Sequence, residues 1–558
     1  MKKPDDDILY VTARGGDLLS DASLNKGSAF TNEERIELGL EGLLPHHVSN
    51  LDEQVQRVLE NFRRQATPID KHVYLRSLQD RNETLFYAAL ISHLAEMMPI
   101  VYTPTVAQAV EEFSHLFAAT RGLYLTPEDS VRMEEVIGNV PCEDVRVVVC
   151  TDNEGILGIG DQGTGGMAIP IGKLALYVAA GGFRPDECLP VCLDVGTDNR
   201  RLLEDPLYLG VKQPRLRGAE YDSFIDSFVE GFKKRLPNAI LQWEDFSRDI
   251  AFENLIRYRD EVCSFNDDIQ GTASVTVASL MGAAKLAGRS FAKEVICIVG
   301  AGCAGVGVTL GILDALQSEG LSLEEAKERV YVFDSRGLLV DTRPGLPDYK
   351  RQVATPASVV EGWGGLSLYD VIERVRPTAL VGLSGHPGAI DEEAVRTMAE
   401  LNERPSIFAM SNPTANAEAV PADILCWSDG RAIITTGSPF DPVEYKGKEY
   451  QFSQANNVYV FPGVGLGAAV CGATRITDRM LTSAARRLHE LTDDADYERG
   501  LVLPPVRDLR SVSAQIGAAV MESAIREGLA AKPAVGDLAK TLRDGMYQPH
   551  YTQYKPAK

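Results

Sequence analysis

Two pairs of adjacent carboxylates set among aromatic residues are the first candidates for chemistry. Glu244 and Asp245 lie between a tryptophan and a phenylalanine, and Asp267 and Asp268 follow a phenylalanine and an asparagine. Adjacent like charges in an apolar frame are costly unless a cation neutralises them. Carboxylates without Cys or His ligands nearby suit a hard metal, so we predict a Mg²⁺ or Mn²⁺ site. Either pair alone is more often a helix cap or half of a salt bridge, and it is the presence of two pairs that favours the metal.

Lys173 is the candidate base. It lies in Pro170-Ile-Gly-Lys-Leu-Ala-Leu-Tyr177, at the start of a predicted helix. A lysine among small and apolar residues is expected to be partly buried, and burial, a nearby metal and a helix N-terminus all disfavour its protonated form. Such a lysine can act as a base near neutral pH. The alternative is a lysine on a helix surface that extends its charge into solvent.

A glycine-rich turn indicates a dinucleotide site. Gly300-Ala-Gly302-Cys-Ala-Gly305 follows an apolar run at 295–299 and opens a helix. The three glycines allow a tight turn, a close approach of backbone to pyrophosphate, and packing of helix on strand. The next predicted strand ends in Asp334, the position of an acid that binds an adenosine ribose. The alternative is a glycine turn of the kind found in any α/β protein.

The residues after this acid favour NADP slightly over NAD. Ser335 and Arg336 follow at once, and Lys350 lies further along the chain. An added 2′-phosphate needs cations and hydroxyl donors, whereas NAD favours the acid alone. The alternative is that Arg336 and Lys350 are ordinary surface charges.

A second glycine turn has the same pattern but a different interpretation. Gly158-Ile-Gly160-Asp-Gln-Gly163 also precedes a helix, and Asp194 ends the next predicted strand. Because Asp161 would repel a pyrophosphate, we interpret this turn as lining a different pocket.

The candidates fall on a helical first part followed by two regions of alternating strands and helices. Apolar residues recur at helix spacing over 51–62, and Thr31 begins a capping box. The apolar run at 84–98 predicts a buried helix that Pro99 stops, followed by an extended piece at 100–104. Strands are predicted at 145–150, 189–194, 295–299, 330–333, 379–381, 407–410 and 432–435. This βαβ rhythm indicates parallel sheets whose carboxyl edges carry the polar residues.

Composition excludes several classes of protein. The 558 residues are too many for one core, so two to four domains are expected. A net charge of -23 with no Lys/Arg-rich run argues against nucleic-acid binding. No apolar stretch approaches the roughly 20 residues that span a bilayer. The N-terminus lacks an apolar signal and the nine cysteines include no C-x-x-C pair, so we predict a cytoplasmic protein without a membrane partner.

Segments in order along nearly the whole chain together resemble the malic enzyme family, and its bacterial members most closely. The matching segments are 24–31, 39–45, 99–105, 158–163, 171–174, 243–246, 265–272, 300–302, 411–414, 436–440, 456–459 and 461–463. The resemblance implies metal-dependent oxidative decarboxylation of L-malate to pyruvate and CO₂ with reduction of NAD or NADP. It also implies a homodimer or homotetramer.

The resemblance also implies a role for individual residues. Tyr102 would be the general acid and Lys173 the general base. The metal ligands would be Glu244, Asp245 and Asp268, with the further catalytic candidate Asp267 beside them. Malate would be held by Asn412, Asn456 and Asn457, and the cofactor by Gly300, Gly302, Gly305 and Asp334. Apart from the resemblance, we predict that Ser335, Arg336, Lys350 and Asn412 also contact the cofactor. The expected fold is α/β. A helical domain spans 1–120, a central parallel-sheet domain 121–266 and 457–530, an inserted Rossmann-type domain 267–456, and a C-terminal arm 531–558.

One position departs from the family. Many members carry an arginine that clamps the substrate carboxylate where this chain has Gly155. Arg248 is a hypothetical substitute. The related malolactic enzymes, which convert malate to lactate with retained NAD, can carry glycine there and are the alternative. A non-catalytic scaffold would be expected to lose the chemical residues, yet Tyr102, Lys173 and the three acids remain.

Overall fold

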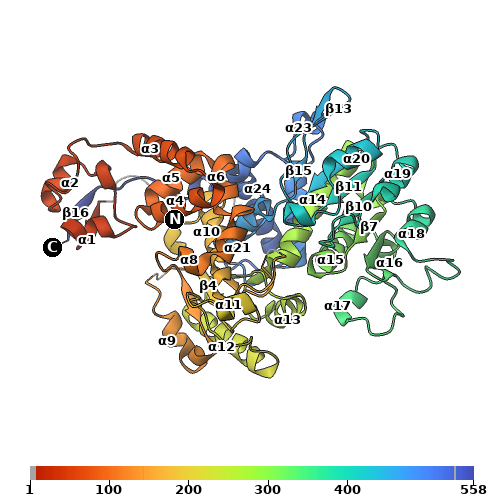
Figure 1. Cartoon of the computed structure of the whole chain (residues 1–558), viewed down its shortest axis with the longest axis horizontal. Coiled ribbons are helices and arrows are strands. Elements are labelled where there is room, and N and C mark those ends of the chain that lie inside the picture. Colours follow the sequence, from red (N-terminus) through yellow and green to blue (C-terminus); the bar gives the residue numbers. More distant parts are fainter. Residues whose placement is uncertain (1–7, 142–143, 157, 533–535, 558) are drawn as a thin grey trace.

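The computed structural model describes residues 8–141, 144–156, 158–532 and 536–557 (Figure 1). Its first part is helical, as predicted. The helices are α1 (Gly15–Ser20), α2 (Asn32–Glu37), α3 (Leu51–Arg64), α4 (Pro68–Gln79), α5 (Glu83–Ser92), α6 (Leu94–Val101), α7 (Thr105–Glu111) and α8 (Phe113–Leu116). Capping boxes at Thr31 and Asn50 fix the starts of α2 and α3. In each box the capping side chain accepts a hydrogen bond from the amide of a glutamate three residues later, and the carboxylate of that glutamate accepts one from the amide of the capping residue.

The predicted single helix over 84–98 is wrong. The chain breaks at His93 (φ −129°, ψ 39°), so that α5 and α6 are separate helices. Pro99 lies inside α6 and does not stop it. The expected extended piece at 100–104 is also wrong, because α6 continues to Val101 and residues 102–104 form a bend and a turn before α7. Both helices pack on α4, where the Ile100 carbonyl meets His72 Nδ1 at 2.8 Å. Burial on this common partner outweighs the local cost of one lost helical hydrogen bond at the proline.

A five-stranded parallel sheet forms the centre. Its strands are β2 (Leu123–Leu125), β3 (Val147–Thr151), β4 (Cys188–Leu193), β5 (Ile240–Trp243) and β6 (Ser264–Asn266), in the order β2-β4-β3-β5-β6. The helices of this region are α9 (Met133–Ile137), α10 (Ala168–Ala179), α11 (Arg200–Glu204), α12 (Ala219–Arg235) and α13 (Arg248–Tyr258). All strand pairs are parallel, so the carboxyl ends of β3, β5 and β6 meet at one edge.

A seven-stranded sheet forms the second region, drawn in green to cyan in Figure 1. Its order is β15-β12-β11-β10-β7-β8-β9, parallel except for β9 on β8. The strands are β7 (Ile296–Val299), β8 (Val330–Asp334), β9 (Gly337–Leu338), β10 (Ala379–Gly382), β11 (Ser406–Ala409), β12 (Ile433–Thr436) and β15 (Ser453–Gln454), with a hairpin of β13 (Val443–Tyr445) and β14 (Lys448–Tyr450). Its helices are α14 (Thr272–Leu286), α15 (Cys303–Ser318), α16 (Leu323–Lys327), α17 (Asp348–Arg351), α18 (Leu368–Val375), α19 (Glu392–Leu401) and α20 (Pro421–Trp427). The seven strands predicted from the sequence are confirmed: two lie in the central sheet, as β3 and β4, and five in this sheet, as β7, β8, β10, β11 and β12.

The last part of the chain returns to the middle of the molecule (Figure 1). Its helices are α21 (Phe461–Cys471), α22 (Asp478–Glu490), α23 (Asp494–Glu498), α24 (Leu509–Arg526) and α25 (Leu538–Gly545), and α14 packs against α22. The end of the chain then crosses to the N-terminal helices, where β16 (Tyr554–Pro556) pairs in parallel with β1 (Leu9–Val11). The predicted arm therefore packs on the first helices of its own chain.

Among the described residues, no single helix is long and apolar enough to cross a membrane, and the one pair of apolar helices that would qualify together is bent by 119°.

Candidate functional site

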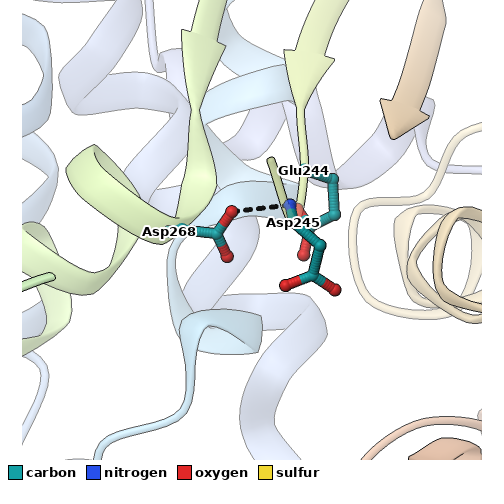
Figure 2. A group of neighbouring side chains, drawn as sticks. All are labelled: Glu244, Asp245 and Asp268. Atoms are coloured by element: carbon teal, nitrogen blue, oxygen red, sulfur yellow. Dashed lines mark hydrogen bonds between the residues drawn. The ribbon is translucent and has the colours of Figure 1, made fainter. Parts of the chain in front are cut away.

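The four predicted carboxylates meet at the carboxyl edge of the central sheet. Because β5 and β6 are neighbours, Glu244 and Asp245 emerge beside Asp267 and Asp268. The Asp245 amide donates a hydrogen bond of 2.7 Å to Asp268 Oδ2. Figure 2 shows Glu244, Asp245 and Asp268 turned toward one another, and one carboxylate oxygen from each lies within 4.8 Å of the other two. This arrangement could hold a divalent cation through oxygen ligands alone.

Aromatic packing fixes this edge. Trp243 is fully buried, stacks on Tyr258 with ring centroids 5.6 Å apart, and meets Phe246 edge-on. On the neighbouring strand, Phe265 is buried, and Asn266 Oδ1 accepts the Ile269 amide at 2.9 Å to begin the turn that carries Asp267 and Asp268. The aromatic frame seen in the sequence is thus the core that holds the acids in place.

Lys173 lies among these acids and not on a helix surface. Every residue of α10 is buried, and the lysine Nζ lies 2.6 Å from Glu244 Oε1 and forms an ion pair with Asp267. Burial by itself lowers the pKa of Lys173, but the two carboxylates outweigh burial and raise that pKa well above its usual range. In the chain alone these acids favour the ammonium. The predicted uncharged amine depends also on a bound metal, which would offset the charge of the acids, and it stays a prediction.

Tyr102 faces the same ammonium. Lys173 Nζ lies 5.7 Å from the centroid of the Tyr102 ring, and the ring is buried. Burial, together with the acids of the site, raises the pKa of Tyr102 well above its usual range, so the phenol keeps its proton. The close approach requires Gly172, since a Cβ there would lie 2.8 Å from the Val101 carbonyl oxygen.

The three predicted asparagines lie in two places. Asn457 Nδ2 donates to Asp267 Oδ2 at 3.1 Å, so it contacts the acid that faces Lys173. Asn456 donates to Thr103, the neighbour of Tyr102. Asn412 follows β11 in the second region and accepts a hydrogen bond from Ser438.

The glycine turn after β7 has the expected geometry. Gly300 has a φ of 121°, and a Cβ there would lie 2.4 Å from the Leu383 carbonyl oxygen. A Cβ at Gly305 would collide with the Gly300 carbonyl, whereas one at Gly302 would meet no atom within 4 Å. Tight turn, close helix–strand packing and an open backbone face are the features that a pyrophosphate site needs.

The acid at the end of β8 is already paired. Asp334 accepts hydrogen bonds from the Arg336 amide at 2.9 Å and from Arg343 Nη1 at 2.7 Å. Arg343 was not among the predicted residues, because no local pattern distinguishes it. Burial favours a higher pKa for Asp334, but these hydrogen bonds outweigh burial and lower it. Ser335 and Arg336 are exposed, and Lys350 is half-buried near the same acid. In the described residues, none of these three side chains forms a hydrogen bond with the Asp334 carboxylate.

Comparison with known proteins identifies the family. Residues 79–259 match the family described as "Malic enzyme, N-terminal domain", and residues 269–525 match "Malic enzyme, NAD binding domain". The chain is 46% identical over 550 residues to the NAD-dependent malic enzyme of Aeromonas hydrophila subsp. hydrophila, covering 98% of each protein. It is 45% identical over 551 residues to that of Acinetobacter baylyi, covering 98% of this chain and 97% of the relative.

This chain belongs to the malic enzyme family. Solved structures agree on the fold. The malic enzyme of Entamoeba histolytica superposes with a TM-score of 0.57 at 21% identity, covering 91% of this chain and 90% of that one. The malic enzyme of Pyrococcus horikoshii gives 0.55 at 22% identity, covering 81% and 88%.

Gly155, where many members of the malic enzyme family carry arginine, has no room for a side chain. A Cβ there would lie 2.4 Å from the Phe246 carbonyl oxygen, and the Gly155 amide donates to the Asp245 carbonyl at 2.8 Å. The side chain of Arg248, the hypothetical substitute, lies outside the described part of the structure.

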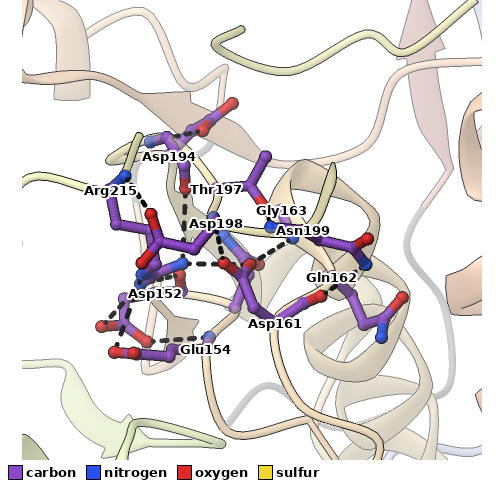
Figure 3. Close-up of polar contacts among 12 residues, drawn as sticks. Asp152, Glu154, Asp161, Gln162, Gly163, Asp194, Thr197, Asp198, Asn199 and Arg215 are labelled. Carbon is purple, nitrogen blue, oxygen red and sulfur yellow. Dashed lines mark hydrogen bonds and ion pairs between the residues drawn. The ribbon is translucent and has the colours of Figure 1, made fainter. Parts of the chain in front are cut away.

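The second glycine turn is held by ion pairs. Asp161 accepts the amides of Gly163 and Asp198 and pairs with Arg215 at 3.3 Å (Figure 3), whereas Asp194 accepts the Val211 amide. Both acids thus make hydrogen bonds within their own region of the chain. The interpretation of this turn as lining a different pocket stays a prediction.

Two further residues, Gln242 and Glu418, were missed by the sequence analysis. Gln242 donates to Glu244 Oε2 at 2.9 Å and accepts a hydrogen bond from Tyr177, so it orients one of the acids. Glu418 is fully buried and accepts hydrogen bonds from Ser384, Gly385 and Ser411, at the carboxyl ends of β10 and β11. A glutamine in a strand and a glutamate after a loop carry no local sign of either arrangement.

Proposed function

We propose that this chain oxidises and decarboxylates L-malate to pyruvate and CO₂, with NAD as hydride acceptor and Mg²⁺ or Mn²⁺ as activator. The observation that carries the proposal is the ammonium of Lys173 in contact with Glu244 and Asp267, opposite Tyr102 and beside two further acids. A base, an acid and a cation site within one buried cluster are what this reaction needs.

The acid set fits a divalent cation. Glu244, Asp245 and Asp268 are the proposed ligands, since they supply hard oxygen donors that converge within 4.8 Å and Cys and His are absent from the described residues of this cluster. Burial and the neighbouring acids raise the pKa of Glu244 well above its usual range and that of Asp268 to about 6. When bound, the cation offsets the negative charge that raises the pKa of Lys173 and polarises the C2 oxygen of malate.

The proposed proton transfers balance. The amine of Lys173 accepts the C2 hydroxyl proton as hydride leaves C2 for NAD. The bond between C3 and its carboxylate then breaks to release CO₂, and the phenol of Tyr102 gives its proton to C3 to form pyruvate. Lys173, the neighbouring ammonium, restores the proton of Tyr102, so one proton is removed and one is returned. Asn457 keeps Asp267 oriented toward the lysine.

We propose NAD in place of the NADP that the cations after Asp334 slightly favoured. The relatives named above are NAD-dependent malic enzymes that match this chain over nearly its full length. Asp334 remains at the end of β8 as a hydrogen-bond acceptor for a ribose hydroxyl. The other cofactor contacts, the domain boundaries, the cytoplasmic location and the homodimer or homotetramer stay predictions.

A malate assay tests the proposal. L-malate is supplied with NAD or NADP, with and without Mn²⁺, and the product is identified. We expect pyruvate and NADH, faster turnover with NAD than with NADP, and no turnover after chelation. Lactate without net NADH would replace the proposal by the malolactic reaction, which the glycine at position 155 favours. Equal rates with both cofactors would overturn the choice of NAD.

A further inference from the structure

We propose that Arg215 positions the 152–163 segment against both halves of the site, and through it holds Asp245. The inference rests on the proposed function for its consequences, but not for its geometry. Arg215 lies outside the proposed catalytic, metal and cofactor residues and contacts none of them directly in the described structure.

Arg215 is buried together with several acids. Its side chain is 0% exposed and lies 3.1 Å from Asp152, 3.6 Å from Glu154 and 3.3 Å from Asp161 (Figure 3). It also donates to the carbonyl oxygens of Asp152 at 2.8 Å and Gly196 at 3.3 Å. A buried charge is tolerated only when it is paired and hydrogen-bonded, and this guanidinium uses its several donors on different parts of the chain.

The three acids belong to one short segment. Asp152 directly follows β3, and Glu154 and Asp161 lie two and nine residues later, so the guanidinium cross-links both ends of the segment. Tyr221 reinforces the first end by donating to Asp152 at 2.8 Å, and the Asp198 amide reinforces the second by donating to Asp161 at 2.7 Å. Arg215 is the one group among them that contacts all three acids.

The same segment touches both sides of the proposed site. The Gly155 amide donates to the Asp245 carbonyl at 2.8 Å. Further along, Gly158 lies against the loop after β11, since a Cβ added to this glycine would be 3.2 Å from the carbonyl oxygen of Asn412. The segment thus lies between a proposed metal ligand and the loop proposed to contact malate and cofactor.

Asp245 needs such support because of its backbone. Its φ is 53°, a left-handed conformation that non-glycine residues adopt only when surrounding contacts impose it. Two hydrogen bonds hold its backbone here: the Gly155 amide donates to its carbonyl oxygen, and its own amide donates to Asp268. If Arg215 is removed, the first contact is free to loosen and Asp245 can relax away from Glu244 and Asp268.

The experiment compares full-length variants. Arg215→Gln removes the charge, and Arg215→Lys keeps it as a point charge that cannot bridge three acids. Arg217→Gln is the matched control, because Arg217 also pairs with Glu154, at 2.6 Å, but is 52% exposed. Amide hydrogen exchange is measured for peptides covering 152–163 and 243–247 without metal, and Mn²⁺ affinity is measured by calorimetry without substrate.

We expect both Arg215 variants to exchange faster in both peptides and to bind Mn²⁺ about tenfold or more weakly, as for other supports of metal ligands. The Arg217 variant should leave both readouts unchanged. Folded Arg215 variants with unaltered exchange at 243–247 would overturn the proposal. The Arg215 variants can exchange faster in both peptides while the wild type neither binds Mn²⁺ nor turns over malate. In that case Arg215 keeps its positioning role and the proposed function fails. Should Arg215→Gln not fold, the exchange result for Arg215→Lys decides.

Discussion

At the scale of single residues, the proposed chemistry depends on how charge is balanced around Lys173. Lys173 lies among four acids and contacts Glu244 and Asp267, which raise its pKa. Burial and the neighbouring acids in turn raise the pKa of Glu244 and Asp268. The chain by itself therefore carries an excess of buried negative charge. A divalent cation would compensate that charge. Metal binding, the protonation of Lys173 and the stability of the fold should therefore depend on one another.

Replacing Lys173 should separate its roles. In Lys173→Met, we expect kcat to fall about 10²–10⁴-fold because the proposed base is lost. Without metal the variant should also be less stable by about 3–5 kcal/mol, since Asp267 and Glu244 lose their buried partner. Added Mn²⁺ should restore much of that stability. Turnover is followed by NADH absorbance, and unfolding by denaturant titration with and without Mn²⁺.

The control for this experiment is Lys234→Met, whose charge is 60% exposed. It should leave both turnover and stability almost unchanged. A Lys173→Met enzyme that keeps kcat within a few-fold of the wild type would exclude the lysine as the base.

His489 predicts a pH dependence away from the site. Burial, with help from Lys285 and Arg486, lowers its pKa from 6.5 to about 4. Between these two values the unfolded chain binds more protons than the folded one, so stability is full above about pH 6.5 and is lost as the pH falls toward 4. His489→Gln should flatten the dependence of the unfolding free energy over this window. The exposed His46→Gln variant is the control, and an unchanged slope in His489→Gln would contradict the assignment.

Individual residues also show what sequence could and could not predict. Glu244, Asp245, Asp267 and Asp268 carry a local sign, because adjacent acids inside an aromatic frame demand an explanation. The charge state of Lys173 could not be predicted, since it depends on acids more than 70 residues away in sequence.

At the scale of elements, parallel strands bring distant residues together. β5 and β6 place two acid pairs side by side, and β10 and β11 place two loops beside the glycine turn of β7. The strands β7, β10 and β11 were predicted from short runs of β-branched and apolar residues, whereas the short strands β5 and β6 were not predicted. The break between α5 and α6 was not predicted either, because it depends on how both helices pack on α4.

Glu418 should hold together the loops that follow β10 and β11 at the carboxyl edge of the seven-stranded sheet. Its carboxylate accepts the amides of Ser384 at 2.7 Å, Gly385 at 3.1 Å and Ser411 at 3.3 Å. In Glu418→Gln an amide group would face these donors, so we expect a loss of about 2 kcal/mol or more in stability and weaker NADH binding, with Mn²⁺ affinity unchanged. NADH fluorescence and Mn²⁺ calorimetry measure the two affinities.

Glu294→Gln provides a matched control for this variant. Glu294 is equally buried but pairs with Arg289 at the opposite, amino end of β7. It should cost stability without changing NADH affinity. Equal effects of the two variants on NADH binding would show that Glu418 has only a general structural role.

At the scale of the whole molecule, the first and the last strands of the described chain lie side by side. β16 pairs with β1, and the Tyr554 amide donates to Glu34 Oε1 at 2.7 Å, the carboxylate that also pairs with the buried Lys26. The sequence analysis predicted a C-terminal arm over 531–558 but not where it packs, because a three-residue strand has too little pattern to specify a partner.

Deleting residues 551–558 should therefore destabilise the first helices. The deletion removes β16 and the Tyr554 ring, whose centroid lies 3.7 Å from Lys26 Nζ. We expect a lower Tm and faster hydrogen exchange over 9–40, with exchange at 243–247 unchanged. Equal protection over 9–40 in the deletion variant would show that the arm contributes nothing to this part of the fold.

The most direct test of the central claim is the stoichiometry of turnover in one sample. L-malate, NAD and Mn²⁺ are incubated with the full chain, and malate, pyruvate, CO₂ and NADH are measured over time. The account predicts one pyruvate, one CO₂ and one NADH for each malate consumed, and none of them after chelation of the metal. Lactate formed without net NADH, or turnover that continues at full rate after chelation, would contradict it.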